Sequence, residues 1–357
     1  MPEPLTTAPE GSKADHRHPR EVKGRSRLQS TLGFLTRVAI SLTLIVWLLS
    51  RVGVGEIVAR WKGVNLWILF LVVPAIHLVA VGIRAWRLKT ILAGVGLDRP
   101  LWWLGLTQLE GAFFASFLPG GIGGDIYRTY RIARATEDSP RSVVSVVIER
   151  LIGSASMLIV SMASLAYGLV FLRHPVFEQL SGTLIIVLIA FIVSSGLLWA
   201  VLKGGFVSRW LAERLPSRFR TILTRVSLPQ IKSEMLIRVA LLSVLLQLAI
   251  VVWYIAVSRS LGIDVPLWNL MLTVPLVELL VMLPISVGGI GVREVAFAAL
   301  LGPFGVAAED AISFSLLAFM LATMIRVLSG TPLLWRFVWK RDNLPGRPAG
   351  NEGSPAD

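Results

Sequence analysis

Long apolar segments constrain the fold of this chain more than any other feature of its sequence. They lie near residues 32–50, 66–88, 101–118, 143–172, 180–202, 238–260, 266–285 and 309–335. Each approaches or exceeds the roughly 20 residues that a helix needs to cross the hydrocarbon core of a bilayer. Backbone polar groups in lipid must be satisfied within their own segment, so segments of this length predict helices. The sequence therefore predicts an all-α polytopic membrane protein.

Composition supports this class and excludes several others. Hydrophobic residues make up 54% of the chain and charged residues 16%, and the mean hydropathy is +0.71. Once the apolar segments are set aside, 357 residues leave no room for a separate soluble enzyme domain. Cysteine is absent, which excludes a disulfide framework, thiolate catalysis and a Cys-ligated metal. We interpret the net charge of +13 as a topology signal and an attraction to anionic headgroups, and we expect no nucleic-acid partner.

One stretch of the sequence occurs twice. Residues 95–107 read VGLDRPLWWLGLT, and residues 261–273 read LGIDVPLWNLMLT. In each copy the apolar segment that follows carries one glutamate, Glu110 or Glu278, and then reaches Leu-Pro and a glycine-rich break. Two helices broken by Pro and Gly at corresponding places in the two halves of a membrane protein point to a substrate site within the membrane.

The two breaks are residues 118–125, which read LPGGIGGD, and residues 283–291, which read LPISVGGIG. Proline ends a helix because it lacks an N–H donor, and glycine lets the backbone turn where a side chain would clash. A helix that starts after each break would point free N–H groups and its positive dipole end at a bound anion. The alternative is that the glycines serve a hinge or close helix packing. The glycines predicted at the site are Gly120, Gly121, Gly123, Gly124, Gly288, Gly289 and Gly291.

Two arrangements of the apolar segments fit the sequence. If all of them cross the membrane, the basic residues divide about evenly between the two sides, contrary to the positive-inside rule. If 101–135 and 266–302 are re-entrant hairpins instead, the basic residues on the far side are only Arg51, Arg60, Lys62, Arg173 and Arg259. We therefore predict six full spans plus two re-entrant hairpins in an inverted repeat, with halves of about 31–172 and 180–338. Eight full spans are the alternative.

The two ends of the chain carry no apolar segment. Residues 1–30 predict a disordered basic cytoplasmic tail and residues 341–357 a second disordered tail, on either side of a transmembrane domain over 31–340. Both termini are expected in the cytoplasm. Residues 203–237 mix arginines with Trp, Leu and Phe, which predicts an amphipathic segment on the cytoplasmic surface. Residues 51–64 predict a shorter one on the far side.

Ionisable residues at membrane depth are candidates for the site, because each costs at least roughly 2.5–3.5 kcal/mol at mid-helix unless it is paired or hydrated. They are Asp125, Arg128, Glu149, Arg150, Arg293, Glu294 and Arg326. Neighbours such as Glu149 and Arg150 point about 100° apart on a helix, so we expect different partners for them, an arginine of the first hairpin in the case of Glu149. A purely structural ion-pair network is the alternative. The sequence holds no metal-ligand spacing, Walker loop or Rossmann turn, so no cofactor or metal is expected.

Taken together, these motifs resemble a known family. The run FASFLPGGIGGD at 114–125, the pair Glu149 and Arg150, the second break with its Val-Arg-Glu and the late Arg326 are similar to the lysylphosphatidylglycerol synthase transmembrane-region family. That family includes the membrane half of the bacterial multiple-peptide-resistance factor. The resemblance implies a plasma-membrane protein that translocates phospholipid. The soluble aminoacyl transferase domain of the full-length factor is not among these residues, so we expect no synthase activity from this chain.

The sequence thus predicts a lipid translocase that binds a phospholipid or a lipid-linked intermediate at a polar site near the bilayer midplane. The residues expected to hold its phosphate are Arg128, Arg293 and Arg326. The carboxylates expected to orient them, or to meet a cationic headgroup, are Asp125, Glu149 and Glu294. Transport would come from one half rocking against the other. Two alternatives stay open: a non-transporting membrane partner of a separate synthase or glycosyltransferase, and a transporter of soluble ions.

Overall fold

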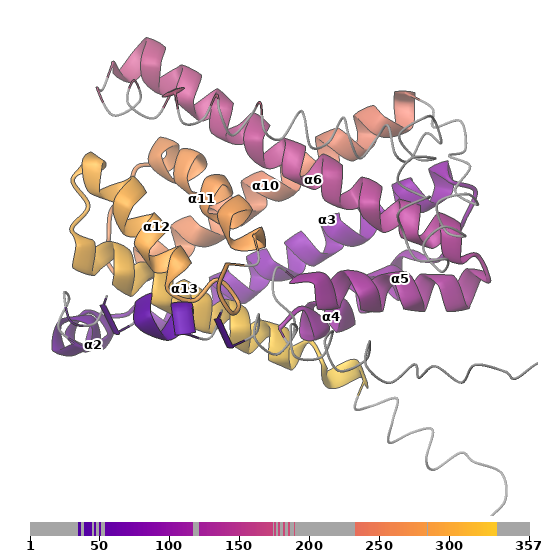
Figure 1. Cartoon of the computed structure of the whole chain (residues 1–357), viewed down its shortest axis with the longest axis horizontal. Helices are drawn as coiled ribbons and strands as arrows, with labels where there is room; N and C mark the ends of the chain where they lie inside the picture. Colours follow the sequence, from indigo (N-terminus) through magenta and orange to yellow (C-terminus); the bar gives the residue numbers. More distant parts are fainter. Residues whose placement is uncertain are drawn as a thin grey trace, which may run out of the picture.

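The computed structural model describes residues 54–116, 121–173, 233–283 and 285–333, with scattered positions within 35–50 and 175–189 (Figure 1). Every regular element in these residues is helical, as the sequence predicts. Several predictions fall wholly or largely outside the described residues, namely those for 1–30, 180–202, 203–237 and 341–357. The predicted segment 32–50 is described only at scattered positions, and these are helical.

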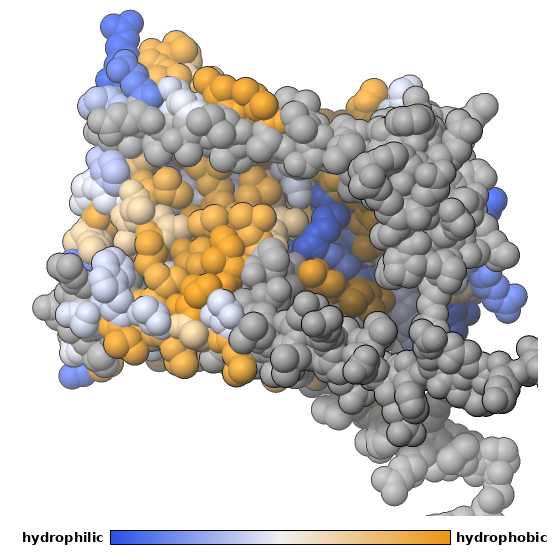
Figure 2. Space-filling view, in the orientation of Figure 1, coloured by the Kyte–Doolittle hydropathy of each residue, from blue (hydrophilic) through white to orange (hydrophobic). Residues whose placement is uncertain are grey.

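Four helices in the described part of the chain are long and apolar enough to cross a membrane. They are Ile68–Gly94, Ser139–Leu172, Ser233–Ser260 and Ala308–Leu333. Each coincides with one of the predicted apolar segments, which confirms a helical, membrane-spanning protein. In Figure 2, apolar side chains cover a wide area of the surface over α11 to α13. A hydrophilic patch lies beside this area, among apolar side chains.

These spans supply most of the labelled elements in Figure 1. The first consists of η1 (Ile68–Val72) and α3 (Val73–Gly94), and the second of α6 (Ser139–Tyr167) and η3 (Gly168–Leu172). The third is α10 (Ser233–Ser260), and the fourth begins with α13 (Ala308–Leu328). The predicted amphipathic segment 51–64 contains α2 (Val54–Lys62), which packs on α13 through Ile57 and an Arg60–Asp310 ion pair of 3.0 Å.

Two pairs of shorter helices lie between the long ones in the chain. α4 (Leu101–Ala115) and α5 (Ile122–Thr136) form the first pair; α11 (Leu267–Met282) and α12 (Val292–Leu301) form the second, followed by the short η4 (Gly302–Phe304). The longest, α11, has 16 residues, and at a rise of about 1.5 Å per residue it extends only about 24 Å. The hydrocarbon core is about 30 Å thick, so none of the four is long enough to cross it upright.

Helices from the two halves of the described chain pack against one another. α3 lies against α10, and Figure 1 shows the α4–α5 pair and the α11–α12 pair on opposite sides of this contact. α4 also contacts α13, whereas α11 contacts α6. Each short pair is therefore covered by a long helix from the other half of the chain.

Interhelical contacts combine apolar packing with buried hydroxyl groups. Tyr254, Phe297 and Phe314 join α10, α12 and α13, with ring centroids 5.2–5.7 Å apart. Between α6 and α11, Ser161 and Ser164 donate hydrogen bonds of 3.2 and 2.6 Å to backbone carbonyls of α11. Such bonds help to hold helices together in lipid, because the hydrophobic effect does little to bring one helix against another there.

The α4–α5 pair depends on glycine at its closest approach. A Cβ added at Gly124 would lie 2.6 Å from the backbone oxygen of Gly111, whereas a Cβ added at Gly105 would meet nothing within 4 Å. We predict that Gly124→Ala destabilises the folded protein by about 1–3 kcal/mol, because backbone in both helices must move. Gly105→Ala on α4 is the matched control and should be neutral or up to about 1 kcal/mol more stable, since Ala favours helix over Gly. Thermal unfolding in detergent measures both; equal melting temperatures would contradict the prediction.

Candidate functional site

A cavity of about 340 Å³, with many charged residues in its lining, lies where the two halves meet. Residues of α3, α4, α5, α6, α10, α11, α12 and α13 all line it. The charged residues among them are Arg84, Arg87, Asp125, Arg128, Glu149, Glu278, Arg293 and Arg326. A cavity with this lining, inside a protein whose outer surface is apolar, is the natural candidate for the site.

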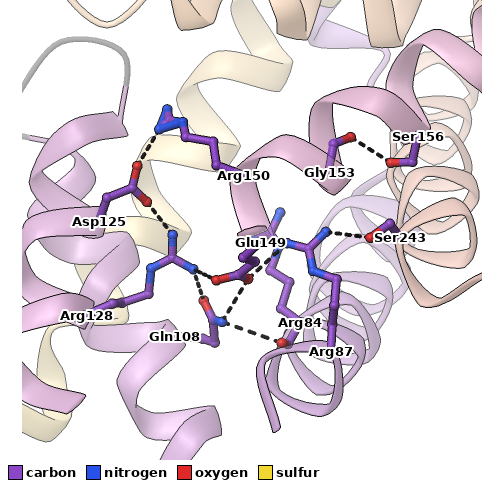
Figure 3. A network of polar contacts seen from close by, with 10 residues as sticks. All are labelled: Arg84, Arg87, Gln108, Asp125, Arg128, Glu149, Arg150, Gly153, Ser156 and Ser243. Atoms are coloured by element: carbon purple, nitrogen blue, oxygen red, sulfur yellow. Dashed lines mark hydrogen bonds and ion pairs between the residues drawn. The ribbon is translucent and has the colours of Figure 1, made fainter. Parts of the chain in front are cut away.

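Glu149 stands at the centre of the charges contributed by the first half (Figure 3). Its carboxylate is 2% exposed and accepts hydrogen bonds from Arg87 Nη2 at 2.9 Å, Arg128 Nη1 at 2.8 Å and Gln108 Nε2 at 3.3 Å. The donors come from α3, α5 and α4. A carboxylate buried in this way is stable only because cationic donors surround it.

The network continues to both sides of Glu149. Asp125 forms ion pairs with Arg128 and with Arg150, and Arg128 also donates to the Gln108 oxygen at 3.0 Å. Arg87 reaches across to Ser243 of α10 at 3.2 Å. Glu149 and Arg150 thus have different partners, and Glu149 pairs with an arginine of the first short-helix pair, as the helical geometry predicted.

The charges contributed by the second half are more sparsely bonded. Glu278 accepts a hydrogen bond of 2.7 Å from the Tyr254 hydroxyl. Arg293 lies over the ring of Phe319, 5.3 Å from its centroid, and Arg326 donates to the Thr323 hydroxyl at 3.0 Å. Within the described residues, neither arginine forms an ion pair with a carboxylate.

The predicted glycines separate into two groups. Gly121 and Gly124 line the cavity, and Gly123 is buried beside them. Gly121 has φ +72°, in the left-handed region that glycine tolerates, and α5 starts directly after it. Gly288, Gly289 and Gly291 are not among the cavity-lining residues; a Cβ added at Gly289 or Gly291 would strike Val281 or Leu44. Gly120 lies outside the described residues.

Glu294 and Arg150 also lie away from this cavity. Glu294 caps the start of α12: its carboxylate accepts the Gly291 N–H at 2.6 Å and the Ser315 hydroxyl at 3.1 Å. One of the N–H groups that we expected to face an anion is therefore occupied by the protein itself. Arg150 lines a neighbouring cavity of about 260 Å³, and the Glu149 network forms a wall shared by both cavities.

Sequence analysis missed several residues of the cavity. Arg84 and Arg87 lie near the end of the predicted apolar segment 66–88 and were not among the candidate site residues; in the structure α3 continues to Gly94 and both line the cavity. Their spacing of three residues puts them on one face of a helix, a signal that could have identified them. Gln108, Tyr254 and His77 carried no comparable signal. Glu110, the glutamate that follows the first copy of the duplicated stretch, is fully buried in α4 and contacts Tyr127 and Arg131 of α5.

Comparison with known proteins agrees with the motifs. Residues 34–330 match the sequence profile of the family described as "Lysylphosphatidylglycerol synthase TM region". The match includes every helix from α2 to α13 and both glycine breaks. No curated protein gives a match to this chain.

The buried position of Glu149 generates a stability prediction. Glu149→Ala leaves the buried Arg87 without a carboxylate and Arg128 with Asp125 alone, so it should destabilise the folded protein by about 3–5 kcal/mol. The matched control is Asp264→Ala, which breaks an ion pair of 2.8 Å with Arg259. This pair lies at the surface, since the Asp264 side chain is 74% exposed and the Arg259 side chain 56%. That change should cost at most about 1 kcal/mol. Unfolding in detergent measures both, and a Glu149→Ala protein as stable as the control would show that the network contributes little to folding.

Proposed function

Because the chain belongs to the lysylphosphatidylglycerol synthase transmembrane-region family, we propose that it is a lipid translocase of a bacterial cell membrane. It binds the headgroup of a phospholipid or lipid-linked intermediate in the cavity between its halves and moves it from one leaflet to the other. The acyl chains stay in the surrounding lipid, since a volume of about 340 Å³ is suited to a headgroup.

The observation that carries this proposal is the charged cavity itself. Eight charged side chains from both halves line one cavity in a chain of which only 16% of residues are charged. Ionisable groups inside a membrane protein are costly, and where they line a cavity they commonly mark a substrate path. A purely structural network would need no cavity, since the charges would be stabilised better by closing onto one another.

The packing supports an inverted repeat with two re-entrant hairpins. α4 and α5 are joined by a short break and are too short to cross the bilayer, and the same holds for α11 and α12. In this proposal the first hairpin enters from the cytoplasm and the second from outside, and both termini are cytoplasmic. The halves rock about the α3–α10 contact, which opens the cavity to each leaflet in turn.

The inverted repeat makes a prediction for the two loops that carry the duplicated Leu/Ile-Asp sequence. Asp98 and Asp264 occupy equivalent, exposed positions in these loops. In the natural cysteine-free chain, Asp98→Cys should be labelled only from the cytoplasm and Asp264→Cys only from outside the cell. An impermeant maleimide on intact and on opened cells measures this. Labelling of both positions from the cytoplasm would contradict the hairpins and favour eight full spans.

Lipid translocation is tested in vesicles. We expect the purified chain in proteoliposomes to expose a labelled phospholipid to an external quencher faster than protein-free vesicles do. Ala322→Trp places an indole in the cavity and should remove most of this activity, whereas Ala75→Trp adds the same ring to the exposed face of α3 and should not. Melting temperatures establish that both variants are folded.

A folded chain that moves none of a panel of phospholipids and polyprenyl phosphates would contradict translocation. It would favour a membrane partner of a separate synthase or glycosyltransferase, which co-purification with such an enzyme could then identify. Equal activity of the Ala322→Trp and Ala75→Trp variants would show instead that lipid moves along another path.

A further inference from the structure

The charges around the cavity are not compensated equally. In the first half both carboxylates are saturated by arginine: Glu149 by Arg87 and Arg128, and Asp125 by Arg128 and Arg150. Neither carboxylate is therefore available to neutralise a further cation. These five groups form a closed network, which can supply hydrogen bonds to a ligand but little net charge (Figure 3).

Three arginines of the cavity remain outside this network. Arg84, Arg293 and Arg326 make no ion pair with any carboxylate in the part of the chain that the structure describes. Arg293 is only 5% exposed, and its Nε is buried without a hydrogen-bond partner among those residues, as is the Nε of Arg326. Guanidinium groups held in this state inside a membrane protein are costly unless an anion reaches them.

Among the described residues that line the cavity, one carboxylate lies outside an ion pair. Glu278 on α11 accepts the Tyr254 hydroxyl and forms no ion pair with a described residue. Against three arginines it leaves a surplus of two positive charges in the cavity. A phosphomonoester or phosphodiester carries one or two negative charges, and the planar guanidinium fits its oxygens by paired hydrogen bonds.

From this surplus we infer that the headgroup bound here is anionic as a whole, a phosphate ester without amino groups, and that the cavity discriminates against aminoacylated lipid. The inference rests on the proposed function and specifies its substrate class. Lysylphosphatidylglycerol carries one phosphate and two ammonium groups, so its headgroup is net positive. Glu278 alone cannot balance two ammonium groups beside Arg84, Arg293 and Arg326. The substrate of this chain therefore differs from the lipid in the name of its family.

Binding to the purified full-length chain in detergent tests the inference directly. The probes are phosphatidylglycerol, phosphatidic acid, lysylphosphatidylglycerol and inorganic phosphate, each titrated by native mass spectrometry or thermal stabilisation. We expect the two anionic lipids to bind at least about tenfold more tightly than lysylphosphatidylglycerol, the difference that one lost charged hydrogen bond makes. Inorganic phosphate should compete only weakly. Equal or tighter binding of lysylphosphatidylglycerol overturns the inference, and competition by phosphate as effective as that by lipid assigns the site to a soluble anion.

Variants of opposite sign separate charge selection from structural effects. Arg84→Gln and Arg326→Gln should each weaken phosphatidylglycerol binding by about tenfold, whereas Glu278→Gln should leave it unchanged or strengthen it. Arg259→Gln, which alters an exposed arginine on α10, is the control. Weaker binding in Glu278→Gln to the same extent as in the arginine variants overturns the inference. Where a variant does not fold, the lipid panel on the unaltered chain still decides.

Measuring the flipping of the same lipids in the vesicle assay distinguishes failure of the inference from failure of the proposed function. Preferential binding of anionic lipid without any flipping supports the charge selection and contradicts translocation. Flipping of lysylphosphatidylglycerol in preference to phosphatidylglycerol overturns the charge selection and supports translocation.

Discussion

The arrangement of the first half depends on one buried carboxylate. Glu149 lies on α6, and the groups that donate hydrogen bonds to it come from α3, α4 and α5, so four helices meet at a single point. Without these donors a charge at this depth would favour another packing or an unfolded segment. Because Arg87 also bonds to Ser243 on α10, the same network connects to the second half.

The duplicated sequence has different structural roles in the two halves. At the first break, Gly124 lines the cavity, and it also allows α5 to pack closely against Gly111 of α4. Close helix packing and a position at the cavity, the two explanations considered for the glycines, therefore meet in one residue. At the second break the glycines turn the backbone and pack against Val281 and Leu44, and Glu294 caps the helix that follows. The first half thus contributes a saturated ion-pair network together with Arg84. The second half contributes Arg293 and Arg326, which, like Arg84, form no ion pair with a carboxylate among the described residues.

Much of the fold could be predicted because hydropathy acts locally. Each predicted apolar segment that falls in the described residues is a helix, and the breaks at proline and glycine lie where the sequence has them. The ends of helices were harder to predict: α3 continues to Gly94, past the predicted segment 66–88. Arg84 and Arg87 lie near the end of that segment and line the cavity. An arginine at the end of an apolar segment looks the same in sequence whether it faces headgroups or the protein interior. Hydropathy and charge counts therefore did not identify these two as cavity residues.

The sequence by itself determined the class of the protein, its helical segments, its repeat and the identity of most charged residues near the site. These follow from the length and polarity of single segments, which lipid selects without reference to their neighbours. Tertiary structure alone decided which charges compensate one another. Arg87 and Glu149 are 62 residues apart, and Arg84, Arg293 and Arg326 come from three different helices. Coulombic pairing depends on distances of a few ångströms, and only the packing of the helices sets those distances.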